Sequence, residues 1–178
     1  LYDDEGTGIH FNTNREETIA DQEMTVELSR IGLKQFRRVI PYMPEMEGWL
    51  GASVHYVDSE GQMMVSADMT LDDFEYEKNP MGNWTMSGAY LPGEDNSHYV
   101  DGFVTLNGKE ITYLNGIYQS DGQGDENITG ELELRHFPLN VINPFIPDGV
   151  VRFRGDLDGT LSMEGNPMKP QLSGALKL

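Results

Sequence analysis

The side chains that could bind a metal or act in catalysis are present in this sequence, but their spacing does not assemble a site. The four histidines, His10, His55, His98 and His136, are far apart in the chain. No His-x-x-His or His-Glu-x-x-His spacing occurs, and there is no cysteine, so neither pattern of metal ligands is present. We therefore interpret the histidines as surface or sheet-edge residues and predict no metal site.

Carboxylates are abundant, with 30 Asp and Glu against 12 Lys and Arg. With so many carboxylates, close acidic pairs such as Asp156 and Asp158 are expected from composition alone and do not indicate catalysis. We interpret this pair as part of a solvated strand face rather than as a general acid and base. The segment 121–127, DGQGDEN, is rich in oxygen ligands but lacks the twelve-residue calcium loop that ends in Glu. We interpret it as an acidic turn, and we predict no catalytic residue and no cofactor.

The net charge limits which partners the chain can bind, and the lengths of its apolar runs limit whether it can span a membrane. The formal charge is −18 and the pI is near 4.3, which disfavours nucleic acid and anionic membrane surfaces as partners. No apolar run is long enough for a signal peptide or a membrane span. The chain begins with Leu1 rather than Met, so we expect it to be a segment of a longer protein.

The elements that would position any functional surface are strands, because apolar residues alternate with polar ones over long stretches. From Val151 to Met163 every second residue is apolar or Gly, and the residues between them are mostly charged or hydroxylated. The alternation resumes from Leu172 to Leu178 after the turn NPMKP. This pattern predicts a hairpin with one dry and one wet face.

The same pattern occurs earlier in the chain, which predicts an internal repeat. Gly48 corresponds to Gly155 at an offset of 107 residues, and VELSRIGLKQFRRVIP from Val26 corresponds to LELRHFPLNVINPFIP from Leu132. We predict one β-groove unit over residues 1–178, with two related repeats at about 26–71 and 132–178 joined by a hairpin-rich middle section.

Roughly ten to twelve strands are expected from the alternation, together with one or two short helices. The helices are predicted from Leu33, where the apolar spacing is helical until Pro41, and from Leu139, where Pro144 limits the helix to a turn or two. Asn107-Gly108 predicts a two-residue hairpin turn. The strand that contains Phe74 and Tyr76 is expected to be interrupted at Pro80 and Gly82.

The dry faces leave two interpretations open. They could form the core of an ordinary β-sandwich, or the sheet could curl into an open trough with an apolar inner wall. Small residues such as Gly159 and Ala52, together with methionines such as Met69 and Met163, favour a bent sheet with an adaptable lining. Spacing alone does not separate the two.

The C-terminal string GDLDGTLSMEGNPMKPQLSGALKL resembles the closing repeat of the TamB/AsmA-like family. The pattern G-x-L-x-G-x-L-x-x-x-G-x-x-x-x-P-x-L-x-G-x-L-x-L falls here on Gly155, Leu157, Gly159, Leu161, Gly165, Pro170, Leu172, Gly174, Leu176 and Leu178. HYVDGFVTLNGKEITYLNGIY, from His98, is similar to strands of Bacteroidetes members, and the chain is identified as an internal or C-terminal segment of such a protein. In the fainter first copy, Ala52 and Ala67 stand where the second has Gly159 and Gly174.

The resemblance implies an elongated, curved, mostly antiparallel all-β sheet folded into a taco-like groove. It implies a non-enzymatic periplasmic protein, anchored in the inner membrane outside this segment, that acts in outer-membrane biogenesis and transfers phospholipid between the membranes. An Omp85-family outer-membrane barrel such as TamA is the implied protein partner, and phospholipid acyl chains are the implied cargo. An alternative is a chaperone that assists the assembly of outer-membrane β-barrels by strand or groove binding. The expected hydrophobic groove consists of Leu50, Val54, Val65, Met69, Val104, Leu157, Leu161, Leu172 and Leu176.

Overall fold

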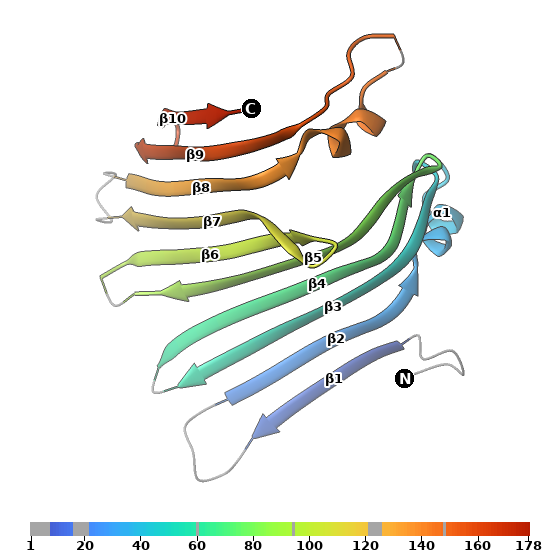
Figure 1. Ribbon diagram of the computed structural model, residues 1–178. Helices are drawn as coiled ribbons and strands as arrows, with labels where there is room; N and C mark the ends of the chain where they lie inside the picture. Colours follow the sequence, from blue (N-terminus) through green and yellow to red (C-terminus); the bar gives the residue numbers. More distant parts are fainter. Residues whose placement is uncertain (1–7, 16–21, 60, 94, 121–125, 148) are drawn as a thin grey trace.

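All strands of the described chain belong to one antiparallel sheet, in which each strand pairs with its neighbours in sequence (Figure 1). The computed structural model describes residues 8–15, 22–59, 61–93, 95–120, 126–147 and 149–178. The ten strands are β1 (Gly8–Arg15), β2 (Gln22–Gly32), β3 (Met46–Ser59), β4 (Gln62–Tyr76), β5 (Asn79–Pro92), β6 (Ser97–Leu106), β7 (Lys109–Ser120), β8 (Glu126–Pro138), β9 (Asp156–Gly165) and β10 (Gln171–Lys177). Short helical segments, η1 (Leu33–Gln35), α1 (Phe36–Val39) and η2 (Leu139–Phe145), follow β2 and β8.

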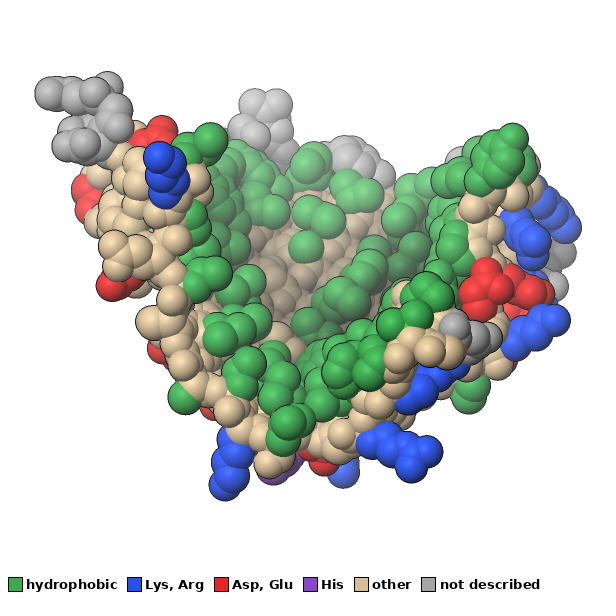
Figure 2. Space-filling model, turned by 90° about the horizontal axis from the view of Figure 1, so that it is seen from above, with side chains coloured by type: hydrophobic (Ala, Val, Ile, Leu, Met, Phe, Trp, Pro, Cys, Tyr) green, Lys and Arg blue, Asp and Glu red, His purple; other side chains and the backbone are tan. Residues whose placement is uncertain are grey.

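The sheet is a single curved layer. Viewed along the direction in which the strands stack, it has a U-shaped section, and hydrophobic side chains line the hollow (Figure 2). The prediction of an open, curved, all-β groove with short helices is therefore confirmed. The alternative of a closed sandwich is wrong for the described residues, because no second sheet covers the first.

Bulges bend β2, β4 and β8 near the end of the sheet that carries the helices. The register shifts after Leu28 in β2, after Leu71 in β4 and after Leu134 in β8. Each bulge contains a non-glycine residue with positive φ, namely Arg30 (49°), Asp73 (50°) and His136 (48°). Because a bulge adds a residue to one strand of a pair, it bends the strand locally and increases its twist.

The buried hydrophobic residues lie at this same end rather than in the middle of the sheet. They are Leu33, Met81, Ile111 and Leu139, each at most 9% exposed. Helical segments η1 and η2 each begin with one of these leucines, so burial of that side chain holds each segment against the sheet.

Removal of either leucine should destabilise the fold. We expect Leu33→Ala or Leu139→Ala to lower the free energy of unfolding by about 2–3 kcal/mol, since each change removes buried methyl groups and leaves a cavity. Leu172→Ala is the matched control, because this leucine is 75% exposed and should change stability by less than about 0.5 kcal/mol. Urea denaturation measures all three, and equal losses would contradict this assignment of the core.

The predicted helices and the Asn107-Gly108 turn are confirmed. The prediction that the final strand pattern begins at Val151 is wrong, because β9 begins at Asp156. The side chain of Asn143 explains the difference: its Oδ1 accepts from the backbone N–H of Phe153 at 2.7 Å, and its Nδ2 donates to the carbonyl of Phe153 at 2.8 Å. These bonds occupy backbone groups that a longer strand would use for pairing with a neighbour.

The predicted break at Pro80 and Gly82 is also wrong. The chain reverses earlier, through Glu77 and Lys78, whose φ angles are 47° and 63°. The side-chain Nδ2 of Asn79 stabilises this turn by donating to the backbone carbonyls of Tyr76 and Glu77 at 3.2 and 2.9 Å. Pro80 and Gly82 are therefore inside β5.

The two segments predicted to be repeats have the same order of elements. β2, η1 with α1, β3 and β4 correspond in order to β8, η2, β9 and β10. Positive φ angles also occur at corresponding positions, at Arg30 and His136 within the bulges and at Gly48 and Gly155 near the start of the following strands. The repeat and its bounds stay a prediction. The centre of the predicted acidic turn, residues 121–125, lies outside the described residues, as do residues 1–7.

Candidate apolar groove

Three rows of residues cross the sheet and line the hollow. Directly paired residues of an antiparallel sheet share a face, so the strand register defines each row. The Val54 row is Val26, Val54, Ala67, Gly88, Gly102, Leu114, Leu132, Leu161 and Gly174; the Val65 row is Met24, Tyr56, Val65, Tyr90, Val100, Gly116, Gly130, Met163 and Leu172; the Met69 row is Leu28, Ala52, Met69, Met86, Val104, Thr112, Leu134, Gly159 and Leu176. The three rows together form what we call the groove face, and each runs from β2 to β10.

Cavities along the groove face are lined mainly by these rows. One, of about 410 Å³, lies over β6 to β10 and is lined by residues that include Leu114, Leu132 and Leu161. Another, of about 480 Å³, lies over β3 to β6 and includes Val54 and Met69. Val100 borders both, so the two hollows meet at β6. Thr112 is the one side chain with a hydroxyl or charged group in the Val54 and Met69 rows.

The opposite face of the same strands is more polar, although Met64, Leu91, Tyr99 and Ile117 form an apolar patch on it. The row next to the Val54 row reads Thr25, His55, Ser66, Ala89, Asp101, Asn115, Glu131, Ser162 and Ser173. Hydrogen bonds between neighbouring strands occur on this face, for example between Thr25 Oγ1 and His55 Nδ1 at 3.0 Å. The apolar and polar faces predicted from alternation are thus separated by the sheet itself.

Most of the predicted groove residues share the groove face. Val54, Val65, Met69, Val104, Leu161, Leu172 and Leu176 lie in the three rows. Leu50 lies in a shorter adjacent row with Ile31, Leu71, Trp84 and Leu106. Leu157 pairs with Phe137 beyond the β8 bulge, at the start of β9. The binding role of these residues stays a prediction.

Sequence reasoning left out several residues that line the hollow, among them Leu114, Leu132, Val100 and Tyr90. The alternation of apolar and polar residues in β5 to β8 could have identified these lining residues. Their exact neighbours depend on the β6–β7 register, which shifts at Val104.

The histidines contact neighbouring side chains instead of forming a cluster. His98 Nδ1 lies 2.7 Å from the hydroxyl of Tyr90, and its ring stacks on that tyrosine with centroids 5.9 Å apart. His136 pairs with Asp158 on the outside of the bulge in β8. Among the described residues, no group of three or more His, Asp and Glu is arranged to hold a metal ion.

Asp158 ties the bulge of β8 to β9. Its Oδ1 accepts from the backbone N–H of His136 at 2.8 Å, and its Oδ2 lies 2.9 Å from His136 Nδ1. The backbone hydrogen bond is the largest cause that lowers the pKa of Asp158 below 3.8, and the side-chain bond and charge of His136 add to it.

This lowered pKa predicts an acid-dependent contribution to stability. Because the folded-state pKa is below the unfolded value, the contribution is fully present above pH 3.8 and is lost as the pH falls through the folded-state pKa. We expect Asp158→Asn to remove it, so the unfolding free energy of the variant should depend less steeply on pH in this range. Parallel pH curves for the two proteins, measured by urea denaturation, would contradict the contribution.

The fold and the groove define the class of protein. An open antiparallel sheet with one continuous apolar face is the architecture that the sequence resemblance implied, and no helix in the described part of the chain is long and apolar enough to cross a membrane. The family model for the N-terminal domain of TamB matches residues 17–178. The chain therefore belongs to the TamB family of membrane-biogenesis proteins, which are associated with the cell envelope, and the predicted resemblance is confirmed. Comparisons with curated proteins and with solved structures gave no match.

Proposed function

We propose that this segment is a non-enzymatic part of a periplasmic conduit that holds the acyl chains of phospholipids during transfer between the inner and outer membranes. The observation that supports the proposal is the groove face, on which three nearly uninterrupted apolar rows follow the hollow from β2 to β10. An acyl chain could move along these rows without crossing a charged side chain. The same proposal includes two features taken from the family resemblance. The parent protein would be anchored in the inner membrane, and it would cooperate with an Omp85-family barrel such as TamA.

The driving force would be burial of hydrocarbon. Each acyl methylene removed from water contributes about 0.8 kcal/mol, and the same burial covers exposed side chains such as Val100 and Leu114. Since the contribution is spread over many similar contacts, no single side chain is indispensable. A bound chain can therefore shift along the groove, as a passive conduit requires.

Titration with the fluorescent fatty acid cis-parinaric acid tests acyl-chain binding. The proposal predicts saturable fluorescence enhancement that unlabelled palmitate competes away. Linear, non-saturating fluorescence would overturn it.

A second candidate function is strand addition to a client β-strand, and the open edges of the sheet favour it. Among the described strands, β1 and β10 each pair on one side only, and every residue of β10 is exposed. Under this alternative, Leu172→Pro or Ser173→Pro in β10 would weaken capture of an outer-membrane strand peptide, since a proline removes a backbone donor. Leu161→Asp on the groove face would leave that capture unchanged.

A further inference from the structure

The face of the sheet opposite the groove face, which we call the outer face, carries a cluster of exposed apolar side chains. Leu91 pairs with Tyr99, and Tyr99 pairs with Ile117, so these three lie side by side on β5, β6 and β7. Met64 of β4 lines the same hollow as they do. The four side chains, which we call the outer patch, are 37–42% exposed. Adjoining apolar side chains with this exposure mark a surface that another molecule covers.

The outer patch borders a hollow of about 410 Å³. Ala89, which also lines the hollow, is two residues before Leu91 and pairs with Asp101. Because the side chain of alanine is shorter than those of Leu91, Tyr99 and Ile117, the surface is lower beside the patch than on it. An apolar side chain of a partner can enter this hollow and contact the patch on its flank.

The charged groups around the outer patch are carboxylates. Strand pairing defines three neighbouring rows on the outer face, through Tyr99, Asp101 and Phe103. From β4 to β10 the described charged side chains of these rows are Asp68, Asp101, Glu131, Glu133 and Glu164, with no Lys or Arg among them. Arg135 lies beyond the rows and forms ion pairs with Glu110 and Glu133. The potential at the outer patch is therefore negative.

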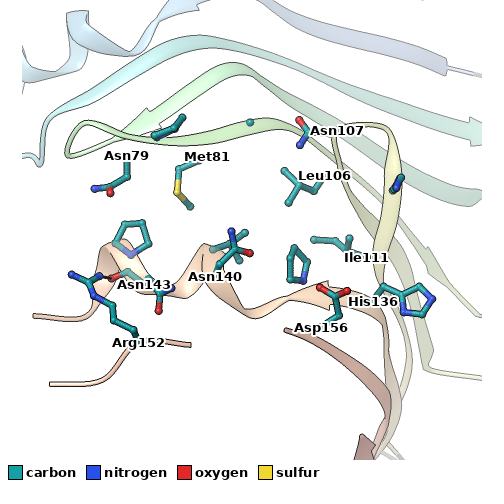
Figure 3. Close-up of a pocket in the computed structure, with 16 residues that line it drawn as sticks. Asn79, Met81, Leu106, Asn107, Ile111, His136, Asn140, Asn143, Arg152 and Asp156 are labelled. Atoms are coloured by element: carbon teal, nitrogen blue, oxygen red, sulfur yellow. Dashed lines mark hydrogen bonds between the residues drawn. The ribbon is translucent and has the colours of Figure 1, made fainter. Parts of the chain in front are cut away.

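This single sign of charge distinguishes the outer patch from the cavity between the β6–β7 turn and η2. That cavity has a volume of about 980 Å³, and its lining contains both Arg152 and Asp156 (Figure 3). Because charges of both signs line it, the cavity selects neither an anion nor a cation. The outer patch, by contrast, favours a partner with positive charge.

We propose that the outer patch binds an amphipathic α-helix of a partner protein. The apolar side of the helix lies on Met64, Leu91, Tyr99 and Ile117, and its Lys or Arg side chains lie beside Asp101 and Glu131. This helix site is on the face opposite the groove, so it does not depend on acyl-chain binding.

A helix suits the outer patch better than an extended peptide does. Strands β4 to β7 are each paired on both sides, so their backbone groups are already hydrogen bonded. An extended peptide laid on the patch would hold its own backbone groups against apolar side chains, whereas a helix satisfies them internally. The patch crosses three strand spacings, about 14 Å, and about three turns of helix cover that length. Each strand then meets about one apolar residue of the helix.

The same charges disfavour two other occupants. A second copy of the chain, docked outer patch to outer patch, would bring Asp101 and Glu131 close to the same carboxylates of its partner. An anionic membrane surface would meet the same repulsion. A basic helix places opposite charges next to these carboxylates, which favours both its docking and its orientation.

The test measures fluorescence anisotropy of a labelled model helix, LKKLLKLLKKLLKL, whose leucines lie on one side. We expect saturable binding to the wild type, and at least about tenfold weaker binding to Tyr99→Thr with Ile117→Thr, since apolar contacts are lost. Val100→Thr with Leu114→Thr is the matched control. It changes the same two strands on the groove face, where the side chains are 45% and 48% exposed, and should bind within about twofold of the wild type.

Asp101→Asn with Glu131→Gln is the second variant, and it leaves the apolar contacts in place. Both side chains are exposed, so the variant should fold like the wild type. We expect it to bind the Lys peptide about threefold more weakly at low ionic strength, with the difference lost at high salt. Glu126→Gln with Asp156→Asn removes the same charge away from the outer patch and should leave binding unchanged.

Four results would overturn the helix site. Equal binding of the acidic peptide LEELLELLEELLEL would contradict the charge selection. Weaker binding by the groove-face control, with no loss in Tyr99→Thr with Ile117→Thr, would place the helix in the groove. A dimer seen by analytical ultracentrifugation and abolished by Tyr99→Thr with Ile117→Thr would assign the patch to a second copy. Sedimentation with phosphatidylcholine vesicles, lost in the same variant, would assign it to a membrane surface.

Discussion

Leu161→Asp is expected to weaken binding of cis-parinaric acid at least about tenfold, which corresponds to about 1.4 kcal/mol. Leu161 lies in the Val54 row between Leu132 and Gly174 and is 36% exposed in the hollow. A carboxylate at this position stays hydrated only while the hollow is empty. An acyl chain laid over it would have to displace that water, and desolvation of an unpaired charge costs several kcal/mol.

Ser173→Asp is the matched control for this change. Ser173 is on the neighbouring strand β10 and belongs to the polar row on the opposite face. The Ser173→Asp substitution adds the same charge close to Leu161 but outside the hollow, so binding of cis-parinaric acid should match that of the wild type. Because both sites are partly or fully exposed, both variants should fold, which the urea midpoint verifies. Equal losses of binding would show that net charge, rather than the groove face, controls the result.

Gly116→Phe is expected to block the hollow without unfolding the sheet. A Cβ at Gly116 would meet the carbonyl oxygen of Thr129 at 3.5 Å and Cα of Gly130 at 3.9 Å, which are ordinary van der Waals contacts. Gly116 and Gly130 are paired in the Val65 row and leave an open floor beside Val100. A phenyl ring would occupy that floor, so we expect at least about a tenfold loss of cis-parinaric acid binding.

Two comparisons separate this steric block from misfolding. Asn115→Phe adds the same ring on the polar face and should leave binding unchanged. Gly102→Phe, by contrast, should destabilise the protein, since a Cβ there would lie 2.7 Å from the carbonyl oxygen of Ser87. We expect a loss of about 1–3 kcal/mol for Gly102→Phe, measured by urea denaturation. Normal binding by a folded Gly116→Phe protein would contradict the position of the acyl chain.

The alternation of residue types was sufficient to predict the strands and their two faces. It works because a strand turns successive side chains to opposite sides, so residues such as Val54 and Leu161 could be assigned to a dry face without coordinates. The short helix from Leu33 was likewise predictable from its apolar spacing and from Pro41.

The register was less accessible, because bulges shift it by one residue. An unbroken hairpin closed by Asn107-Gly108 would place Val104 opposite Ile111, whereas the bulge after Val104 places it opposite Thr112. That shift brings Leu114 onto the groove face beside Gly102. Bulges depend on local bonds between side chain and backbone, such as Asn83 Oδ1 to the N–H of Asp73 at 2.7 Å, which no periodic pattern encodes.

The choice between an open groove and a closed sandwich could not be made from the alternation, because both architectures place every second residue on one apolar face of the sheet. Nor could the cavity between the β6–β7 turn and η2 be predicted, since it depends on where β7 and β8 separate and on the contact between Tyr76 and Phe145, which are far apart in the chain. Both features follow from curvature, which accumulates over the whole sheet.

Native mass spectrometry of the purified wild-type protein is the most direct test of the central claim that the groove face holds lipid acyl chains. The account predicts a fraction of the protein with added mass equal to that of a phospholipid, which is lost in the Gly116→Phe variant and kept in the Asn115→Phe variant. Wild-type protein that carries no phospholipid, and takes up none when phosphatidylethanolamine is added, would contradict it.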